Sequence, residues 1–222
     1  MSQFDDARAD IVAVAHDLAA RGLVLGTAGN VSVRVGDLYA ITATGAVFET
    51  ITEDQVVLID NAGQVVEGGL EPTSETDLHL GIYADNAAGA IVHTHAPAAV
   101  AAGLVADEIP CLHYQLLTLG GSIRVAPYAT FGTRELADHV RTALVGRSAA
   151  LMANHGAVAY GATLAAALDA TALMEWACDI YLRASAVGVP RTLDAQAQAA
   201  VITAALTRGY GSTRPIDKEE TL

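Results

Sequence analysis

Residues 90–97 read Ala-Ile-Val-His-Thr-His-Ala-Pro, an apolar run that ends in two histidines and a proline. Such a run is typical of a strand buried inside a sheet, because short apolar stretches of this length need cover on both faces. Pro97 ends the strand, since proline lacks the N–H that a central ladder requires. An alanine-rich helix is expected directly after it. This unit predicts a sheet with helices packed against it.

The segments on either side of this unit predict hairpins and further helices. Two β-prone runs, 31–35 and 38–41, surround Gly36-Asp37, which is a hairpin signal. A helix is expected to open at Ser74, because Ser74 and Asp77 have the spacing of a capping box. Further strands are expected at 56–59, 64–66, 123–125 and 149–153, and further helices at 3–21, 114–119, 133–144, 163–186 and 192–206. The fold class is therefore α/β, with a mixed, largely antiparallel sheet flanked by helices.

Length and composition favour one domain, residues 1–222, with a polar tail from about residue 209. Hydrophobic residues make up 52% of the chain, which is enough for a full core at this length. The formal net charge is −13 and no basic cluster offsets it. Neither nucleic acid nor an anionic membrane surface is therefore an expected partner.

The chain is expected to be cytoplasmic. Residues 1–6 are acidic where a signal peptide would be basic. The most apolar stretch, residues 156–168, is too short to span a bilayer. The two cysteines, Cys111 and Cys178, are too few for a disulfide framework and are expected to be reduced.

Three histidines are candidates for a metal site. His93 and His95 are two residues apart on a strand, so both imidazoles point to the same face. His155 follows another strand, and Gly156 beside it lets the backbone turn and expose the imidazole. Together they favour zinc (Zn2+), and the alternative is three hydrogen-bonded core histidines. The other four are expected on helix surfaces or in packing: His16, His79, His113 and His139.

Glu75 is the candidate base beside this metal. It follows Ser74 at a helix start, where an acid is also favoured by the helix dipole alone, so both interpretations stay open. In the functional interpretation, Glu75 ligates zinc at rest and then leaves to remove a proton. A substrate oxygen takes the vacated position, because catalytic zinc sites keep one position exchangeable.

Two loops and one helix start have the composition of an anion site. The loop 27–30 reads Thr-Ala-Gly-Asn, and a second loop follows the strand that ends at Ile41. Hydroxyls at a helix N-terminus, beside its free amides, suit a phosphate. These residue types are also ordinary in loops, and no Walker loop or dinucleotide fingerprint supports nucleotide binding. The candidate phosphate-binding residues are Thr27, Gly29, Asn30, Thr44, Gly45, Thr73 and Ser74.

In their order along the chain, these motifs resemble the zinc-dependent class II aldolase and epimerase family. They are Thr-Ala-Gly-Asn at 27–30, Thr-Gly at 44–45, Pro-Thr-Ser-Glu at 72–75, His-Thr-His at 93–95 and Asn-His-Gly at 154–156. Residues 109–114 and 126–136 look like the aldolases of that family in particular. The resemblance covers about residues 5–186. Ala28 departs from a serine often found there, which removes one phosphate hydroxyl.

The resemblance implies a three-layer α/β/α fold that cleaves a ketose 1-phosphate to dihydroxyacetone phosphate and a small aldehyde. Zinc on His93, His95 and His155 would act as a Lewis acid, and Glu75 would shuttle the proton beside the carbonyl. The resemblance also implies that Tyr114 protonates the aldehyde oxygen. Phe131 and Tyr210 would line the aldehyde pocket.

The resemblance further implies a homotetramer with active sites between subunits. Tyr114 lies beyond a whole helix after His95, at the expected periphery of its own subunit, so the adjoining subunit would supply it. One alternative is a sugar-phosphate 4-epimerase, whose members carry Asp where this chain has Glu75. Another is a catalytically inactive binding or scaffold module, against which the three histidines and the glutamate argue.

Overall fold

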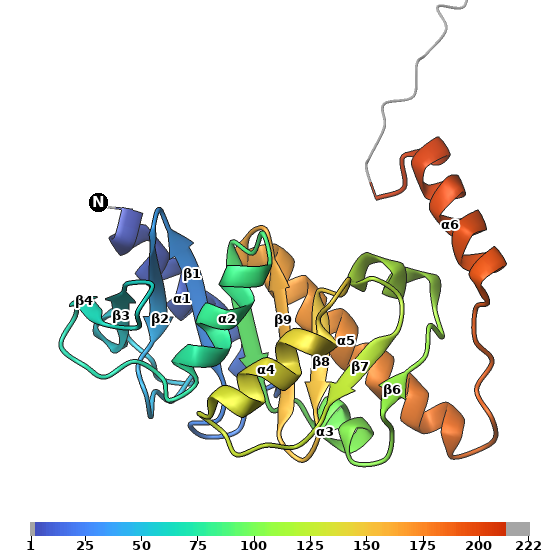
Figure 1. Cartoon of the computed structure of the whole chain (residues 1–222), viewed down its shortest axis with the longest axis horizontal. Helices are drawn as coiled ribbons and strands as arrows, with labels where there is room; N and C mark the ends of the chain where they lie inside the picture. The colour runs from blue at the N-terminus through green and yellow to red at the C-terminus, as the bar shows by residue number, and fades with distance from the viewer. Residues whose placement is uncertain (1–2, 212–222) are drawn as a thin grey trace, which may run out of the picture.

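The structure is a computed structural model in which residues 3–211 are described. Its middle layer is a nine-stranded sheet with the strand order β4-β3-β2-β1-β5-β9-β8-β7-β6 (Figure 1). The strands are β1 (Asn30–Val35), β2 (Leu38–Thr42), β3 (Val56–Ile59), β4 (Val65–Glu67), β5 (Ala90–Thr94), β6 (Glu108–Ile109), β7 (Ile123–Ala126), β8 (Ala149–Met152) and β9 (Gly156–Gly161). Neighbouring strands are antiparallel apart from the parallel pair β7–β8, which confirms the predicted mixed, largely antiparallel sheet.

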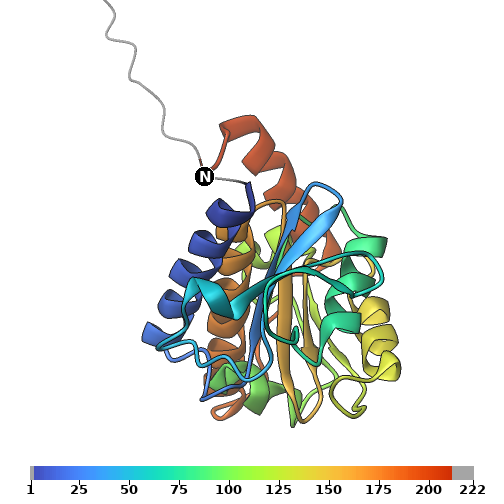
Figure 2. The ribbon, with the colours of Figure 1, turned by 90° about the vertical axis from the view of Figure 1, so that its left-hand side faces the viewer.

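Helices cover both faces of this sheet, as the turned view shows (Figure 2). They are α1 (Gln3–Ala20), α2 (Thr76–Asp85), α3 (Pro97–Gly103), α4 (Arg134–Ala143), α5 (Leu164–Ser185) and α6 (Ala195–Arg208), with short 3-10 helices η1 (Glu53–Gln55) and η2 (Tyr114–Leu119). One apolar core lies between the sheet and α1, α3 and α5, and a second between the sheet and α2 and α4. No described helix is long and apolar enough to cross a membrane.

Strand β5 lies between β1 and β9 and contributes to both cores. Val92 faces the core of α1, α3 and α5, whereas Ile91 faces the core of α2 and α4. His93 is two residues after Ile91 and therefore points to the α2 side. In the antiparallel ladders His93 is paired with Asn30 of β1 and with Val158 of β9.

Strand β9 is absent from the sequence prediction, and so is the two-residue strand β6. Residues 156–161 read Gly-Ala-Val-Ala-Tyr-Gly, a composition with weak β-propensity. The segment is a strand because it pairs with both β5 and β8. Gly161 also lets α5 approach closely, since a Cβ there would lie 2.6 Å from the backbone nitrogen of Ala167.

The prediction that Ser74 caps α2 is wrong. The helix begins at Thr76, and Glu75 occupies the N-cap position without a side-chain capping bond. Thr73 takes the free amides instead: its carbonyl accepts from the Thr76 N–H at 3.2 Å, and its hydroxyl accepts from the Glu75 N–H at 3.3 Å. Ser74 is thereby left to face a cavity.

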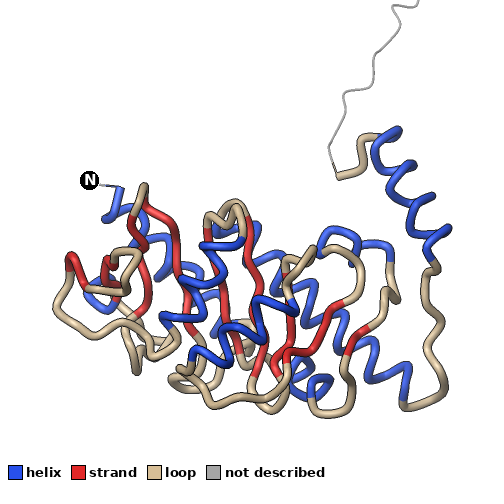
Figure 3. The backbone as a smooth tube through the Cα atoms, viewed as in Figure 1, coloured by secondary structure: helices blue, strands red, loops and turns tan. Residues whose placement is uncertain are grey.

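Two helices at the C-terminal side also differ from expectation. The predicted helix 114–119 is a 3-10 helix, η2, which suits a piece this short between its cap at His113 and Gly120. The last helix, α6, begins at Ala195 because the Asp194 carboxylate caps it, accepting from the Ala197 N–H at 2.8 Å. It buries none of its residues and stands apart from the sheet (Figures 1 and 3). Of the predicted polar tail, residues 212–222 lie outside the described part.

The core beneath β5 generates a matched stability prediction. Val92 is fully buried, whereas Val189 is 96% exposed. Val92→Ala should lower the free energy of unfolding by about 2–3 kcal/mol, because it removes buried apolar surface and leaves a cavity. Val189→Ala should change it by less than about 0.5 kcal/mol. Urea denaturation of both variants measures the difference, and equal losses would contradict this description of the core.

Candidate active site

His93, His95 and His155 meet beside the end of β5. Their ring centroids are 4.9–5.0 Å apart. One ring nitrogen of each lies within 4.8 Å of the others, so the three could hold a metal ion. The structure therefore brings together the three histidines that the sequence singled out.

The hydrogen bond at the back of His93 fixes which nitrogen faces the site. Nδ1 lies 2.9 Å from the carbonyl oxygen of Ala157, so it carries the proton and donates. Nε2 then faces Nε2 of His95 at 3.1 Å and Oε2 of Glu75 at 3.0 Å. Electron pairs directed at one another in this way require a cation between them, and a divalent metal fits this donor set.

Charge within the cluster is distributed unevenly. Burial opposes a charge on His93, but the Glu75 carboxylate and the Ala157 carbonyl outweigh it and raise the pKa of His93. Burial, followed by the charge of His93, lowers the pKa of His95 to about 4 and also lowers the pKa of His155. The imidazoles of His95 and His155 therefore remain neutral at neutral pH, as metal ligands must be.

Glu75 completes the cluster from the start of α2. Its side chain is buried, with Oε2 accepting from Nδ2 of Asn30 at 2.9 Å. Oε1 lies 3.4 Å from Nε2 of His155 and has no hydrogen-bond partner. Burial opposes the carboxylate, but His93 and Asn30 outweigh it and lower the pKa of Glu75. Glu75 is therefore ionised at neutral pH, and its unpaired oxygen is suited to a metal ion or a proton.

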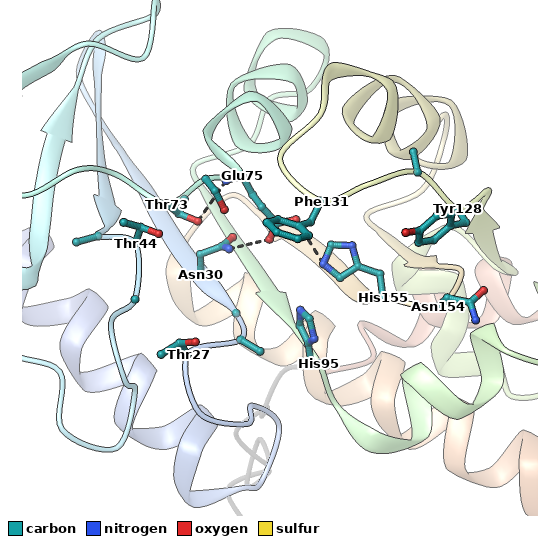
Figure 4. Close-up of a pocket in the computed structure, with 16 residues that line it drawn as sticks. Thr27, Asn30, Thr44, Thr73, Glu75, His95, Tyr128, Phe131, Asn154 and His155 are labelled. Atoms are coloured by element: carbon teal, nitrogen blue, oxygen red, sulfur yellow. Dashed lines mark hydrogen bonds and ion pairs between the residues drawn. The ribbon is translucent and has the colours of Figure 1, made fainter.

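A cavity of about 580 Å³ opens over Glu75, His95 and His155 (Figure 4). All seven candidate phosphate-binding residues line this one cavity, together with Phe131: Thr27, Gly29, Asn30, Thr44, Gly45, Thr73 and Ser74. No Lys or Arg is among the described residues that line it. An anion here would be held by hydroxyls and backbone amides.

Backbone hydrogen bonds assemble the anion-side loops. The Thr44 N–H donates to the Glu71 carbonyl at 3.0 Å, and the Thr73 N–H donates to the Thr42 carbonyl at 3.1 Å. Gly29 has φ +118°, and a Cβ there would lie 3.0 Å from the carbonyl oxygen of His93. Glycine therefore allows the first loop to pass directly against β5.

Asn30 differs from the other loop residues in what its side chain does. Nδ2 donates to Glu75, and Oδ1 lies 2.5 Å from Nε2 of His79. Both ends of the amide therefore make a hydrogen bond inside the protein although the residue borders the cavity.

Tyr114 and Tyr210 do not line the cavity of their own chain. Their hydroxyls hydrogen-bond to each other at 2.8 Å, and the rings are 38% and 64% exposed. Four lining residues belong to the motifs of the sequence analysis but were not predicted as site residues: Ala28, Tyr128, Ala129 and Asn154.

Sequence reasoning missed His79, which was expected on a surface or in packing. It is fully buried and hydrogen-bonded to Asn30 and Ser32. Its spacing of four residues from Glu75 was an available signal, because residues i and i+4 share one face of a helix.

Comparison with known proteins shows the family of the chain. Residues 9–182 match the family model of the class II aldolase and adducin N-terminal domain. The chain is 41% identical over 194 residues to an L-fuculose phosphate aldolase of Escherichia coli O6:H1, covering 86% of this chain and 90% of the relative. It is 37% identical over 210 residues to a 5-methylthioribulose-1-phosphate/5-deoxyribulose-1-phosphate aldolase of Rhodospirillum rubrum. That alignment covers 94% of this chain and 95% of the relative.

Solved structures give the same result. A structure of L-fuculose 1-phosphate aldolase superposes with a TM-score of 0.86 at 34% identity, covering 92% of this chain and 97% of the other. The chain belongs to the class II aldolase and adducin N-terminal domain family. Its aldolase relatives indicate a lyase.

The contact between β9 and β5 generates a prediction about metal binding. A Cβ at Gly156 would lie 2.4 Å from the Thr94 carbonyl oxygen and 3.2 Å from the rings of His93 and His95. Gly156→Ala should therefore separate the imidazoles and weaken Zn2+ binding by about 10–100-fold, as is usual when support for metal ligands is lost. Isothermal titration of the metal-free protein with Zn2+ measures this.

Gly188→Ala is the control, because a Cβ at Gly188 meets nothing within 4 Å. A Gly156→Ala protein with unchanged Zn2+ affinity would show that the approach of the two strands does not set the spacing of the imidazoles.

Proposed function

We propose that the chain cleaves a ketose 1-phosphate, L-fuculose 1-phosphate or a related deoxyketose 1-phosphate, to dihydroxyacetone phosphate and a small aldehyde. The observation that carries this proposal is that one cavity is bordered by two chemically different groups of residues. The ionised Glu75, His95 and His155 form one side, with His93 buried beside them, and hydroxyls with loop amides form the other. The relatives described above are named for cleaving sugar 1-phosphates of this kind.

The phosphate would lie against the two loops and the turn before α2. Thr27, Thr44, Thr73 and Ser74 offer hydroxyls, and the glycines Gly29 and Gly45 allow backbone amides to come close. Ala28 lines the same wall without a hydroxyl. Asn30 would contribute mainly from behind, because its amide already binds Glu75.

His93, His95 and His155 would hold Zn2+, with Glu75 as a further ligand at rest. When bound, the ion supplies Lewis acidity toward the carbonyl and hydroxyl oxygens of the keto-phosphate. The neutral state of His95 and His155 leaves their nitrogens ready to ligate.

Glu75 would transfer the proton of the substrate carbon that lies beside the carbonyl. In the condensation direction, its carboxylate takes the proton from the carbon beside the carbonyl of dihydroxyacetone phosphate. That carbon then bonds to the aldehyde carbon, and Tyr114 gives a proton to the aldehyde oxygen. Cleavage is the reverse: the proton of the substrate hydroxyl returns to Tyr114 and the carbon–carbon bond breaks. The carboxylic acid of Glu75 then protonates the carbon that is left.

We further propose a homotetramer in which the adjoining subunit supplies Tyr114. In one chain the pair Tyr114–Tyr210 is exposed and lies outside the cavity, so a neighbour could bring it to a cavity that already holds Phe131. Head-to-tail contacts of this kind close into rings. Phe131 and Tyr210 would then line the aldehyde side.

A panel of ketose 1-phosphates tests the function, with release of dihydroxyacetone phosphate as the readout. The wild-type protein loaded with Zn2+ should cleave at least one of them, and treatment with a chelator should abolish cleavage without unfolding the chain. Glu75→Gln should lower turnover by about 10²–10⁴-fold, because an acid–base group is lost.

Glu75→Asp is the matched variant, since it keeps the carboxylate but shortens its reach by one methylene. Interconversion of two sugar phosphates without release of dihydroxyacetone phosphate would point to an epimerase instead. If the Glu75→Gln protein still exchanges the carbon-bound proton of dihydroxyacetone phosphate with solvent at the wild-type rate, Glu75 is not the base.

Subunit exchange tests the assembly. Glu75→Gln and Tyr114→Phe should each be nearly inactive alone. Mixed and allowed to exchange subunits, they should recover about a quarter of wild-type activity, because random closed rings pair an intact Glu75 with an intact Tyr114 at that frequency. A mixture that exchanges subunits, verified by mass spectrometry, yet stays inactive would contradict a shared site.

A further inference from the structure

A line of buried polar side chains runs from Glu75 into the interior between the sheet and α2. Nδ2 of Asn30 lies 2.9 Å from Oε2 of Glu75, and Oδ1 of Asn30 lies 2.5 Å from Nε2 of His79. Nδ1 of His79 lies 2.6 Å from the hydroxyl of Ser32, which lies 2.8 Å from the hydroxyl of Tyr83. All five residues are buried.

The carboxylate of Glu75, at one end of this line, fixes the direction of every hydrogen bond in it. An ionised carboxylate can only accept, so Asn30 must turn its NH₂ to Glu75 and its carbonyl to His79. His79 must then donate from Nε2–H, which leaves Nδ1 to accept from the Ser32 hydroxyl. Ser32 in turn accepts from Tyr83. All donors therefore point toward Glu75, and hydrogen bonds aligned in this way strengthen one another.

His79 is held in the neutral form that this pattern needs. Its ring is fully buried, and both of its hydrogen-bond partners, Asn30 and Ser32, are neutral, so a positive charge on the ring would be buried without a counter-charge in contact. At neutral pH the ring therefore has one proton, and the hydrogen bond from Ser32 leaves Nε2 as its position.

The far end of the line is held rigidly. The Arg34 guanidinium lies 4.8 Å from the centre of the Tyr83 ring and donates to the Tyr83 carbonyl at 3.2 Å. Tyr39 stacks on Tyr83 at 4.4 Å between ring centroids. These contacts fix the position of α2, which carries both Glu75 at its start and His79 one turn later.

Asn30 has few other partners that could orient its amide. It stands directly opposite His93 in the ladder between β1 and β5, and His79 is the hydrogen-bond partner of its side-chain carbonyl oxygen. Without the Nε2–H donor, the Asn30 carbonyl would be buried without a partner, and the amide would rotate or withdraw. Glu75 would then lose the hydrogen bond that holds Oε2 beside His93, while its Oε1 has no partner to hold the carboxylate in place.

We propose that His79 is a positioning residue of the aldolase site: it orients the Asn30 amide, which holds Glu75 in the geometry for proton transfer. This role rests on the proposed function, because it assumes that Glu75 is the base. His79 does not line the cavity and touches no substrate. It acts on the reaction through Asn30 alone.

His79→Phe tests the role, because phenylalanine fills the space of the ring without a donor. It should lower kcat by about 10–100-fold, the usual loss for a group that orients an active-site residue, with KM changed by less than about threefold. His79→Gln restores an N–H donor of similar reach and should recover most of the loss. His16→Phe is the matched control, since His16 hydrogen-bonds elsewhere, to the Ile51 carbonyl, and should leave kcat unchanged.

A double-mutant cycle separates this role from the proposed function. If His79 acts through Glu75, adding His79→Phe to Glu75→Gln should cause no further loss of turnover. Losses that multiply would overturn the role of His79 while leaving Glu75 as the base. A Glu75→Gln protein with full turnover would overturn the proposed function itself, whatever His79→Phe does.

The tautomer of His79 gives a readout that needs neither substrate nor metal. Nitrogen-15 NMR of the metal-free wild-type protein, with histidine labelled, should show a neutral His79 ring protonated at Nε2. This measurement stands even if His79→Phe fails to fold. A ring protonated at Nδ1 would reverse the hydrogen bond to Ser32 and overturn the proposal.

Discussion

The carboxylate of Glu75 lies inside the protein, 3.0 Å from Nε2 of His93, and the site is arranged around this buried charge. A buried carboxylate is stable only where donors or cations surround it. Here an amide lies on one side of it and imidazoles on the other, and one of its oxygens is left unpaired. The same arrangement suits a divalent ion and a transferable proton, so the requirement for stability and the requirement for chemistry coincide.

The sheet supplies these surroundings for the Glu75 carboxylate because β1, β5 and β9 lie side by side as antiparallel neighbours. Asn30 on β1 and the Ala157 carbonyl on β9 flank His93 on β5, so the two strands beside it supply its partners directly. The loops that precede β1 and follow β2 then border the same cavity. Strand β5 fixes His93, and His95 and His155 follow the ends of β5 and β8, so the sheet sets the positions of all three imidazoles.

The two faces of the sheet have different tasks. The core toward α1, α3 and α5 is apolar and alanine-rich, which allows close packing. The face toward α2 carries the polar line from Glu75 to Tyr83 within a second apolar core. Outside both cores stands α6, which buries none of its residues, and the aromatic pair Tyr114–Tyr210 links it to η2. The three histidines and Glu75 thus come together within one chain, whereas the aromatic pair stays exposed outside the cavity.

The sequence by itself determined the parts of this protein that depend on nearby residues. The spacing of His93 and His95 on one strand face, the hairpin at 36–37 and most helices follow from local periodicity and turn chemistry, and the order of motifs identified the family. Tertiary structure alone decided β9, whose weak propensity is outweighed by pairing on both edges. It also decided that His79 is buried against Asn30, 49 residues away in sequence. The reason is physical: such partners are non-local, and only the folded sheet brings them within hydrogen-bonding distance.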